Sequence, residues 1–229
     1  MKAKSIFQCA ALLTGLLFLN VPLFAAVESD IVGYTTIPME AGKWYMMTAP
    51  FVGLSEGATI NDLLCGGFCD NDLLYLYDNT TGTYKAIRAW KDGMWRMGTA
   101  NTTPATDVLP PGQGFFIVKA APSTVTIAGQ VSDHEVSTFG SESGPVWSMT
   151  GVCYPEGVQL NSLSWSGLAN GDLLYLYDNE TNSYKAIRAW KDGAWRVGTA
   201  NSTLATDLIK PGQGFFINKV STGTGSYSK

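Results

Sequence analysis

Short apolar and aromatic runs, separated by turn residues, recur along the chain from about residue 30 onward. Examples are "LLYLY" (73–77), "TYKAIRAW" (83–90), "MWRM" (94–97) and "GQGFFIVK" (112–119). Runs of this length, bounded by Gly, Pro, Asn and Asp, indicate strands, whereas only "ATINDLL" (58–64) has helical spacing. The pattern predicts an all-β protein with about six short strands in each of two units, arranged as antiparallel β-sandwiches or small barrels.

An internal duplication organises the chain. Residues 72–119 and 172–219 align without a gap and are identical at 37 of 48 positions, whereas 56–71 and 156–171 agree at only 5 of 16. A match that close indicates tandem units of one fold. The predicted division is a signal peptide (1–26), two β repeat units (27–121 and 122–220) and a flexible C-terminal tail (221–229). An alternative assigns the strand 124–131 to the first unit, where it would close that unit's sheet.

The nearly identical part of each unit contains an Asp-Gly hairpin. A two-residue turn at Asp92-Gly93 needs positive φ at both residues, which Asp-Gly favours, and it places Trp90 opposite Trp95. Strand alternation then predicts one shared face in each unit. Its members are Tyr84, Arg88, Trp90, Trp95 and Met97 in the first unit and Tyr184, Arg188, Trp190, Trp195 and Val197 in the second.

This face has two open interpretations. In the first, each Trp pair covers the sheet as part of the core, and Arg88 stacks on an indole. In the second, the face is exposed and binds sugar rings, with Arg88, Asp92 and Asn101 supplying hydrogen bonds. The first is favoured, because aromatic side chains on sheets more often belong to a core. The candidate ligand-binding residues are Tyr84, Arg88, Trp90, Trp95, Tyr184, Arg188, Trp190 and Trp195.

The N-terminus predicts export. Lys2 and Lys4 precede an uncharged apolar run (6–24), and Ala25 and Ala26 follow it before the polar "VESD". This is the arrangement of a cleaved signal peptide. The protein is therefore expected to be secreted, periplasmic or on the outer cell surface, with no transmembrane segment after cleavage.

The charge balance argues against nucleic acid as a partner. Loss of Lys2 and Lys4 moves the formal charge from −4 to −6, because 13 basic and 19 acidic residues remain. Nucleic-acid binding needs clustered Lys and Arg that displace counterions from phosphates. The expected partner is instead a protein or a glycan at the cell surface.

The cysteines suggest one disulfide. Cys65 and Cys69 flank "GGF" and could close a tight loop in an oxidising compartment. The bridge would be confined to the first unit, because Trp165 and Ala169 occupy the equivalent positions in the second. Cys153 is then left over as a buried, reactive or intermolecular thiol.

Residues for catalysis or metal binding are sparse. The one histidine, His134, lies between the repeated blocks, and no G-x-S-x-G motif accompanies it. Asp72 and Asp78 would sit about 20 Å apart along a strand, too far to share an ion or to act as a carboxylate pair. No metal and no cofactor are expected.

Four N-x-[S/T] triplets occupy matching positions in the two units. They begin at Asn79, Asn101, Asn179 and Asn201. The triplets can be read as glycosylation acceptors or as ordinary turn residues. The second interpretation is favoured if the protein is bacterial.

Several short motifs resemble a known group of proteins. "SDIVGYTTI" directly after a signal, "AGKWYMMTAPF", "LPPGQGFFI" and "STVTIAGQV" are similar to segments of uncharacterised exported bacterial β-repeat proteins with PGxGFWI- or GKGYWI-type strands. This chain has Phe115-Phe116 and Phe215-Phe216 where that group often has Tyr-Trp. The resemblance implies export and β-structure only.

The preferred functional hypothesis is a non-catalytic structural or interaction protein, secreted or at the cell surface, built from two duplicated β units. The alternative is a bivalent carbohydrate-binding module that uses the hairpin Trp pairs, which requires those indoles to be exposed. A hydrolase built around His134 is the third hypothesis and has the least support in the sequence.

Overall fold

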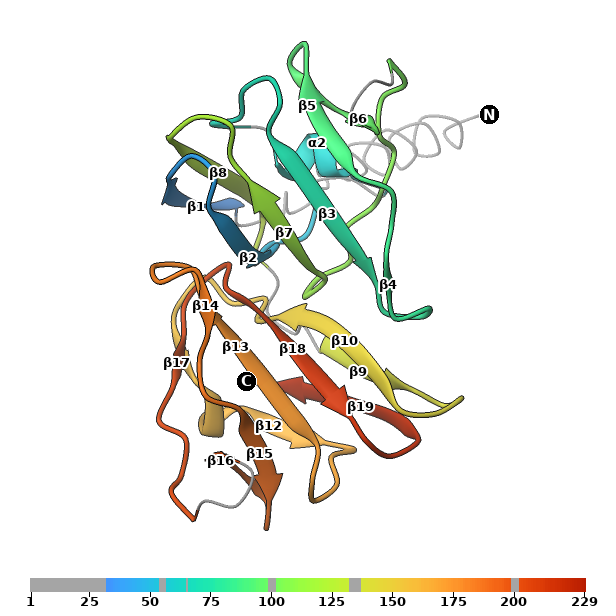
Figure 1. The fold of residues 1–229 in the computed structure, drawn as a ribbon, viewed down its shortest axis with the longest axis vertical. Coiled ribbons are helices and arrows are strands. Elements are labelled where there is room, and N and C mark those ends of the chain that lie inside the picture. Colours follow the sequence, from blue (N-terminus) through green and yellow to red (C-terminus); the bar gives the residue numbers. More distant parts are fainter. Residues whose placement is uncertain (1–31, 54–56, 65, 99–101, 132–136, 199–201) are drawn as a thin grey trace, which may run out of the picture. The chain divides into compact units, whose positions relative to one another are not determined.

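Strand pairing divides the chain into two similar halves (Figure 1). Each half has one large antiparallel sheet, with one smaller sheet in the first half and two in the second. The computed structural model describes residues 32–53, 57–64, 66–98, 102–131, 137–198 and 202–229. These residues belong to one compact unit, Ile31–Lys229. The predicted signal peptide (1–26) lies outside them. The open sheets confirm the all-β prediction, as two tandem sandwiches rather than barrels.

In the first half, the large sheet has the strand order β2-β7-β3-β5-β6, with β4 attached to β3, and β1 pairs with β8. The inner sheet faces enclose a core that includes Leu74, Phe115 and Ile127. The element bounds are β1 Val32–Met39, β2 Trp44–Thr48, α2 Ile60–Leu63, β3 Leu73–Asp78, β4 Thr83–Tyr84, β5 Arg88–Lys91, β6 Met94–Met97, β7 Gly114–Val118 and β8 Ser123–Gln130.

The second half repeats this plan. Its large sheet has the order β10-β18-β13-β15-β16, with β14 attached to β13, and β19 pairs with both β9 and β12. A separate core contains Leu174, Phe215 and Tyr227. The element bounds are β9 Ser137–Ser141, β10 Val146–Gly151, β11 Val158–Gln159, η1 Leu160–Ser162, β12 Ser164–Ser166, β13 Leu173–Asp178, β14 Ser183–Tyr184, β15 Arg188–Lys191, β16 Ala194–Val197, β17 Leu208–Ile209, β18 Gly214–Lys219 and β19 Gly223–Ser228.

The strand pairing moves two predicted boundaries. β8 pairs with β1 of the first half along its whole length, so the sheets follow the alternative that assigned 124–131 to the first unit. The predicted flexible tail (221–229) instead contains β19, the counterpart of β8. Tyr227 on β19 is only 1% exposed, and its hydroxyl donates to Gly151 O at 2.8 Å. The Gly- and Ser-rich composition hid this strand, because only one large side chain marks its inner face.

The Asp-Gly hairpin has the predicted register. Asp92 and Gly93 have φ values of 52° and 79°, and Trp90 lies opposite Trp95. Asp192 and Gly193 adopt the same turn, with Trp190 opposite Trp195. The local turn chemistry therefore determines this register in both halves.

A single helical turn protects the outer edge of each hairpin. Thr59 caps α2, and Asp62 completes the capping box. The helix presents Asn61, whose side chain accepts from Trp95 N at 2.6 Å and donates to Trp95 O at 3.3 Å. Asn161, on η1, makes the same contacts in the second half. Because β6 and β16 end their sheets, these asparagines satisfy main-chain groups at an otherwise open edge.

Candidate binding site at the repeat junction

The hairpin indoles belong to the two cores. Trp95 and Trp195 are 0% exposed, Trp90 is 8% exposed, and Trp190 is partly buried. The rings of each pair lie edge to face, with centroids 5.4 Å apart in the first half and 5.2 Å in the second. The indoles point between the sheets rather than toward solvent. The interpretation of this face as an exposed sugar-binding surface is therefore wrong, and the interpretation of the Trp pairs as part of the core is confirmed.

The expectation that Arg88 stacks on an indole is wrong. Its Nε and Nη2 donate to the Asp107 carboxylate at 2.6 and 2.8 Å, and Arg188 binds Asp207 with the same geometry. Both guanidinium groups are buried, so each pair ties the long loop after the hairpin to the sheet. Asp107 and Asp207 are not among the sequence-predicted site residues. Their equal spacing from Arg88 and Arg188 is the signal that could have found them.

The two other proposed hydrogen-bonding residues play no part in that face. The Asp92 side chain is exposed, and its carboxylate lies 3.6 Å from Arg96 Nη2. Asn101 lies outside the described residues, as does Asn201.

Tyr84 is separated from the tryptophans. Residues 85–87 interrupt the predicted strand, so Tyr84 belongs to β4 and pairs with Tyr77 of β3. Tyr84 and Tyr184 are 47% and 48% exposed, and each ring packs edge to face on the tyrosine beside it. Partial burial raises the pKa of Tyr184 to about 12. It also raises the pKa of Tyr84, to which the neighbouring Tyr184 contributes.

The outer faces of the two large sheets meet at a surface that we call the repeat junction. Alternation along β2 explains it, because Tyr45 and Met47 point into the core while Met46 points outward. Phe116 packs edge to face on Tyr177 at 5.4 Å, and Phe216 packs reciprocally on Tyr77 at 5.2 Å. The buried members of the junction are Met46, Tyr77, Phe116, Met149, Tyr177 and Phe216.

Two asparagines fasten the junction in a reciprocal way. Asn79 accepts from Met149 N at 2.7 Å and donates to Met149 O at 3.1 Å. Asn179 does the same with Met46 N and O, at 2.9 and 3.2 Å. β10 and β2 are end strands of their sheets, so each half protects the open edge of the other. Asn79 and Asn179 lie in turns, and their side chains additionally bind across the junction.

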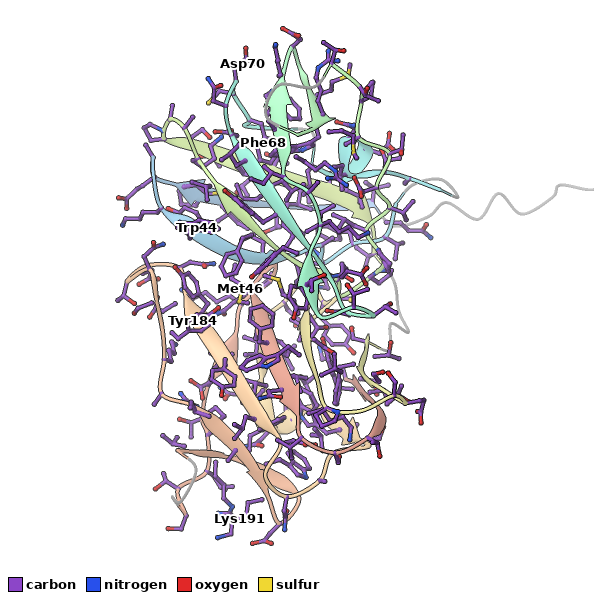
Figure 2. All side chains as sticks on the ribbon, turned by 45° about the vertical axis from the view of Figure 1, so that its right-hand side comes forward. Trp44, Met46, Phe68, Asp70, Tyr184 and Lys191 are labelled. Atoms are coloured by element: carbon purple, nitrogen blue, oxygen red, sulfur yellow. The ribbon has the colours of Figure 1, made fainter. Side chains whose placement is uncertain are left out.

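A cleft of about 540 Å³ opens beside the junction, and we call it the aromatic cleft. Trp44, 39% exposed, packs on Tyr75 with ring centroids 4.8 Å apart. Asn182 accepts from Trp44 N and donates to Trp44 O, at 3.3 and 2.6 Å. Figure 2 places Trp44 and Tyr184 on facing sides of the junction. The cleft is lined by Trp44, Tyr75, Tyr84, Lys85, Ile87, Phe116, Tyr177 and Tyr184.

Of the sequence-predicted site residues, the structure brings only Tyr84 and Tyr184 into this cleft. The principal new member, Trp44, was aligned with Trp147 in the sequence but was not assigned to a site. Its outward position at the start of β2, one alternation step from Met46, is the signal that could have identified it.

Asp72 and Asp78 make contacts that stabilise the local structure. Asp72 is fully buried and bound by Lys119 Nζ, while the backbone N–H groups of Cys69 and Ala120 donate to it at 2.9 and 2.7 Å. Asp78 accepts from Thr80 N at 2.9 Å, and this bond is the largest influence lowering the pKa of its carboxyl group. Among the described residues, no group of three or more His, Cys, Asp or Glu side chains could hold a metal ion.

The proposed disulfide stays a prediction, because Cys65 lies outside the described residues. Cys69 has a free thiol in the structure, and its Sγ lies 3.4 Å from Asp72 Oδ1. Desolvation, followed by the Asp72 charge, raises the pKa of this thiol. Cys153 is buried, with Sγ 3.5 Å from Ser137 Oγ. His134 also lies outside the described residues, so the hydrolase hypothesis has no geometry to support it.

Comparisons with protein-family models, curated proteins and solved structures found no match to this chain. Within the part of the chain that the structure describes, no helix is both long and apolar enough to cross a membrane.

Proposed function

We propose that this protein is an exported, non-catalytic binding module whose ligand site is the aromatic cleft. The observation that carries the proposal is the meeting of three exposed aromatic side chains from both halves in one cleft. Trp44 comes from the first half, and Tyr84 and Tyr184 come from matching positions of the two repeats. Exposed aromatic clusters beside a rigid scaffold are typical of recognition surfaces.

The fixed geometry of the junction supports a binding role. The reciprocal Asn79 and Asn179 contacts hold the two halves in one arrangement, so the cleft is formed before any ligand arrives. Pre-organisation lowers the entropy lost on binding. The buried carboxylates of Asp72 and Asp107 are bound to cations within their own half, which favours a structural role for them over acid–base work.

Carbohydrate is the ligand class that we favour for the cleft. Flat aromatic faces pack on the C–H faces of sugar rings, while Lys85 and the two tyrosine hydroxyls can bond ring hydroxyls. This moves the carbohydrate hypothesis from the hairpin Trp pairs to the junction. Export predicts that the ligand is met outside the cytoplasm.

Affinity electrophoresis in gels that contain soluble β-glucan, mannan or xylan tests the proposal. At least one polysaccharide should retard the full chain, and Trp44→Ala or Tyr184→Ala should abolish the retardation. Tyr34→Ala is the matched control, because Tyr34 is a 74% exposed aromatic residue outside the cleft. No retardation by any polysaccharide, or equal retardation of all variants, would remove the carbohydrate assignment.

The non-catalytic part of the proposal has its own test. Prolonged incubation with the retarding polysaccharide should release no reducing ends. Release that disappears on substitution of a single residue would show that the protein is an enzyme.

A further inference from the structure

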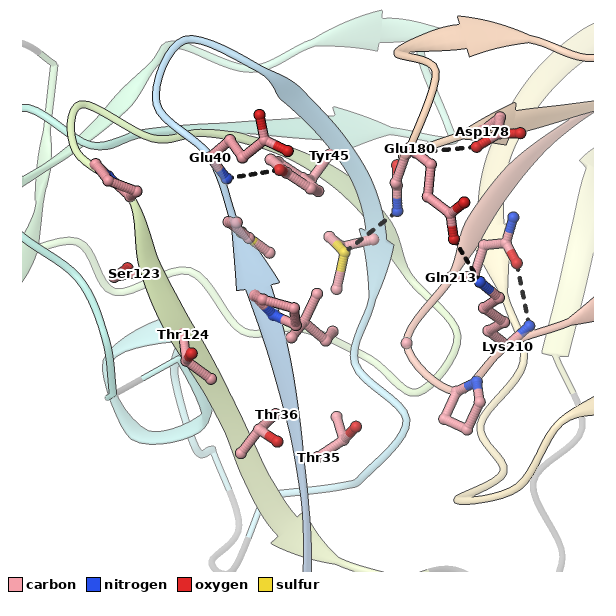
Figure 3. A pocket seen from close by; sticks show the side chains of 18 of the residues that line it. Thr35, Thr36, Glu40, Tyr45, Ser123, Thr124, Asp178, Glu180, Lys210 and Gln213 are labelled. Carbon is pink, nitrogen blue, oxygen red and sulfur yellow. Dashed lines mark hydrogen bonds and ion pairs between the residues drawn. The ribbon is translucent and has the colours of Figure 1, made fainter.

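A groove with a volume of about 980 Å³ runs along β1, and we call it the β1 groove (Figure 3). One wall is six consecutive residues, from Thr35 to Glu40, and the opposite wall comes from the second half, where Lys210–Gln213 and Glu180 line it. It shares no lining residue with the aromatic cleft. A second interaction surface is therefore available on the same scaffold.

The wall formed by β1 is an open strand edge. Among the described residues β1 pairs with β8 alone, so its other edge carries unpaired main-chain groups. Pro38 lies opposite Thr124, and a proline within a sheet directs its nitrogen away from the partner strand. Thr36 and Tyr34 share that orientation, because alternate residues of a strand point their main-chain groups to the same side. Their N–H groups therefore face the open edge.

The second half contains a smaller counterpart groove, which we call the β9 groove. Its volume is about 340 Å³, and it is lined by β9 and the Pro110–Gln113 loop of the first half. The edge of β9 is partly satisfied there, since Gly140 N donates to Ser148 Oγ at 2.9 Å. A side chain on Gly112 would clash with Ser137 Oγ, whereas a Cβ on Gly212 in the β1 groove would lie 3.3 Å from Ile37. The duplication thus produced a large β1 groove and a smaller β9 groove.

The two loops that face these grooves have also diverged. Lys210 and Glu180 form an ion pair of 2.9 Å in the β1 groove wall, where the β9 groove has Pro110 and Thr80. These positions are among the few that differ between the 48-residue blocks. The β1 groove therefore has a polar outer wall opposite an apolar floor that includes Ile37 and Met47.

We propose that the β1 groove receives an extended peptide segment of a partner protein, which adds to β1 as a further antiparallel strand. Main-chain bonding to an open edge supplies affinity in this mode of recognition, and alternate side chains supply specificity. The Lys210–Gln213 wall stands opposite the edge, so the space suits a single extended chain. A second copy of β1 would bring its own sheet with it.

The chemistry of the groove defines the segment that fits. Alternate residues should be β-branched or apolar, to pack on Ile37 and Met47, and the others should be small and hydroxylated. β8 has this pattern, with Val125 and Ile127 buried and Thr126 between them. A capped synthetic peptide with its sequence, "STVTIAGQV" (123–131), is therefore a rational probe.

Titration calorimetry and hydrogen exchange on the full chain test the proposal. The probe peptide should bind with a Kd on the order of 100 µM, as a short flexible ligand would. Exchange of the Tyr34 and Thr36 amides should slow, while the Thr35 and Ile37 amides, already bonded to β8, should change little. Thr36→Pro removes one outward N–H group and should weaken binding at least tenfold, whereas Thr36→Val should bind normally.

Two control variants test whether the effect of Thr36→Pro is specific to the β1 edge. Thr138→Pro makes the same change at the equivalent position of β9 and should leave binding unchanged, as should Trp44→Ala, which separates this proposal from the aromatic cleft. If Thr36→Pro fails to fold by circular dichroism, N-methylation of alternate peptide residues replaces it. One methylated set should abolish binding and the other should not.

Three results would overturn the proposal. The first is no saturation at millimolar peptide, and the second is equal affinity of the Thr36→Pro and Thr36→Val variants. The third is a change in amide exchange at positions other than Tyr34 and Thr36, or one that does not depend on the peptide. Faster exchange at Val125 and Ile127 would mean that the peptide displaces β8. Protection of Tyr34 that grows with protein concentration alone would assign the edge to a second copy of the chain.

Discussion

The same hairpin sequence lies in two different surroundings. In the first half, Trp95 Nε1 donates to Leu64 O at 3.2 Å, and Phe68 packs against both indoles. In the second half, Trp165 supplies the packing, with its ring 5.4 Å from that of Trp195. Among the described residues, Trp195 Nε1 is a buried donor with no hydrogen-bond partner. The hairpin register survives this change, so the diverged flanks determine only how well the core satisfies its polar groups.

The buried lysines differ in the same way. Lys119 binds Asp72 and also donates to Gly67 O at 2.8 Å, with both charged side chains 0% exposed. Lys219 lies 4.0 Å from Asp172 and donates instead to Ser221 Oγ at 2.6 Å. Identical residues at identical sequence spacing therefore form a tight ion pair in one half and a loose one in the other.

The largest expected change in stability comes from replacing these lysines. Lys119→Met should lower the free energy of unfolding by about 3–5 kcal/mol, because it leaves the buried Asp72 carboxylate without its cation. Both carboxylates keep two backbone donors, but Lys219 lies 4.0 Å from Asp172, so Lys219→Met should have an effect about 2 kcal/mol smaller. Urea denaturation measures both. Equal losses would mean that the two pairs are equivalent in solution.

The junction asparagines should behave alike where the lysines differ. Asn79→Ala and Asn179→Ala each remove two hydrogen bonds to the edge strand of the other half, and each should cost about 2 kcal/mol. Chemical denaturation of both variants provides the measurement. Asn61→Ala is a useful comparison, because it removes the hydrogen bonds to the edge strand β6 within one half. If only one of the two junction variants is destabilised, the reciprocal arrangement is wrong.

A smaller difference is expected between the buried indoles. Trp95→Phe loses a hydrogen bond as well as volume, whereas Trp195→Phe removes a donor that has no partner. Trp95→Phe should therefore be more destabilising by about 1 kcal/mol. Thermal and urea unfolding of the pair should agree on the sign. The reverse order would indicate that Trp195 Nε1 is satisfied in solution.

The smallest effect concerns the exposed tyrosines. The pKa of Tyr184 is raised from 10.0 to about 12, because burial disfavours its anion. Its contribution to stability is thus complete below pH 10 and is lost as the pH rises toward about 12. Tyr184→Phe should flatten that decline slightly, as followed by unfolding at several alkaline pH values. Ultraviolet titration that shows Tyr184 ionising near pH 10 would contradict this environment.

Some features of the fold follow from local sequence. Asp92-Gly93 specifies its turn, and the pairing of Trp90 with Trp95 follows from the turn alone. The duplication predicted two similar β units because nearly identical segments fold alike. The burial of the Trp pairs was favoured for the general reason that large aromatic rings more often lie in a core.

Other features needed the assembled sheets. The strand at Gly223–Ser228 was hidden by its composition and became identifiable only through its pairing with β9. The separation of Tyr84 from Arg88 depends on a break at residues 85–87 that the alternating pattern did not mark. Asp107 reaches Arg88 from a long loop, whose path local sequence does not determine.

The sequence by itself determined most of the apolar strands, the hairpin turns and the tandem plan, since these depend on neighbouring residues and on side-chain alternation. Tertiary structure alone decided which faces are buried against the other half. Met46 and Asn79 look like an ordinary strand residue and an ordinary turn residue until β2 and β10 are brought together. The aromatic cleft and the β1 groove arise in the same way. Each is built from segments more than 100 residues apart, and contacts over that distance depend on packing rather than on local pattern.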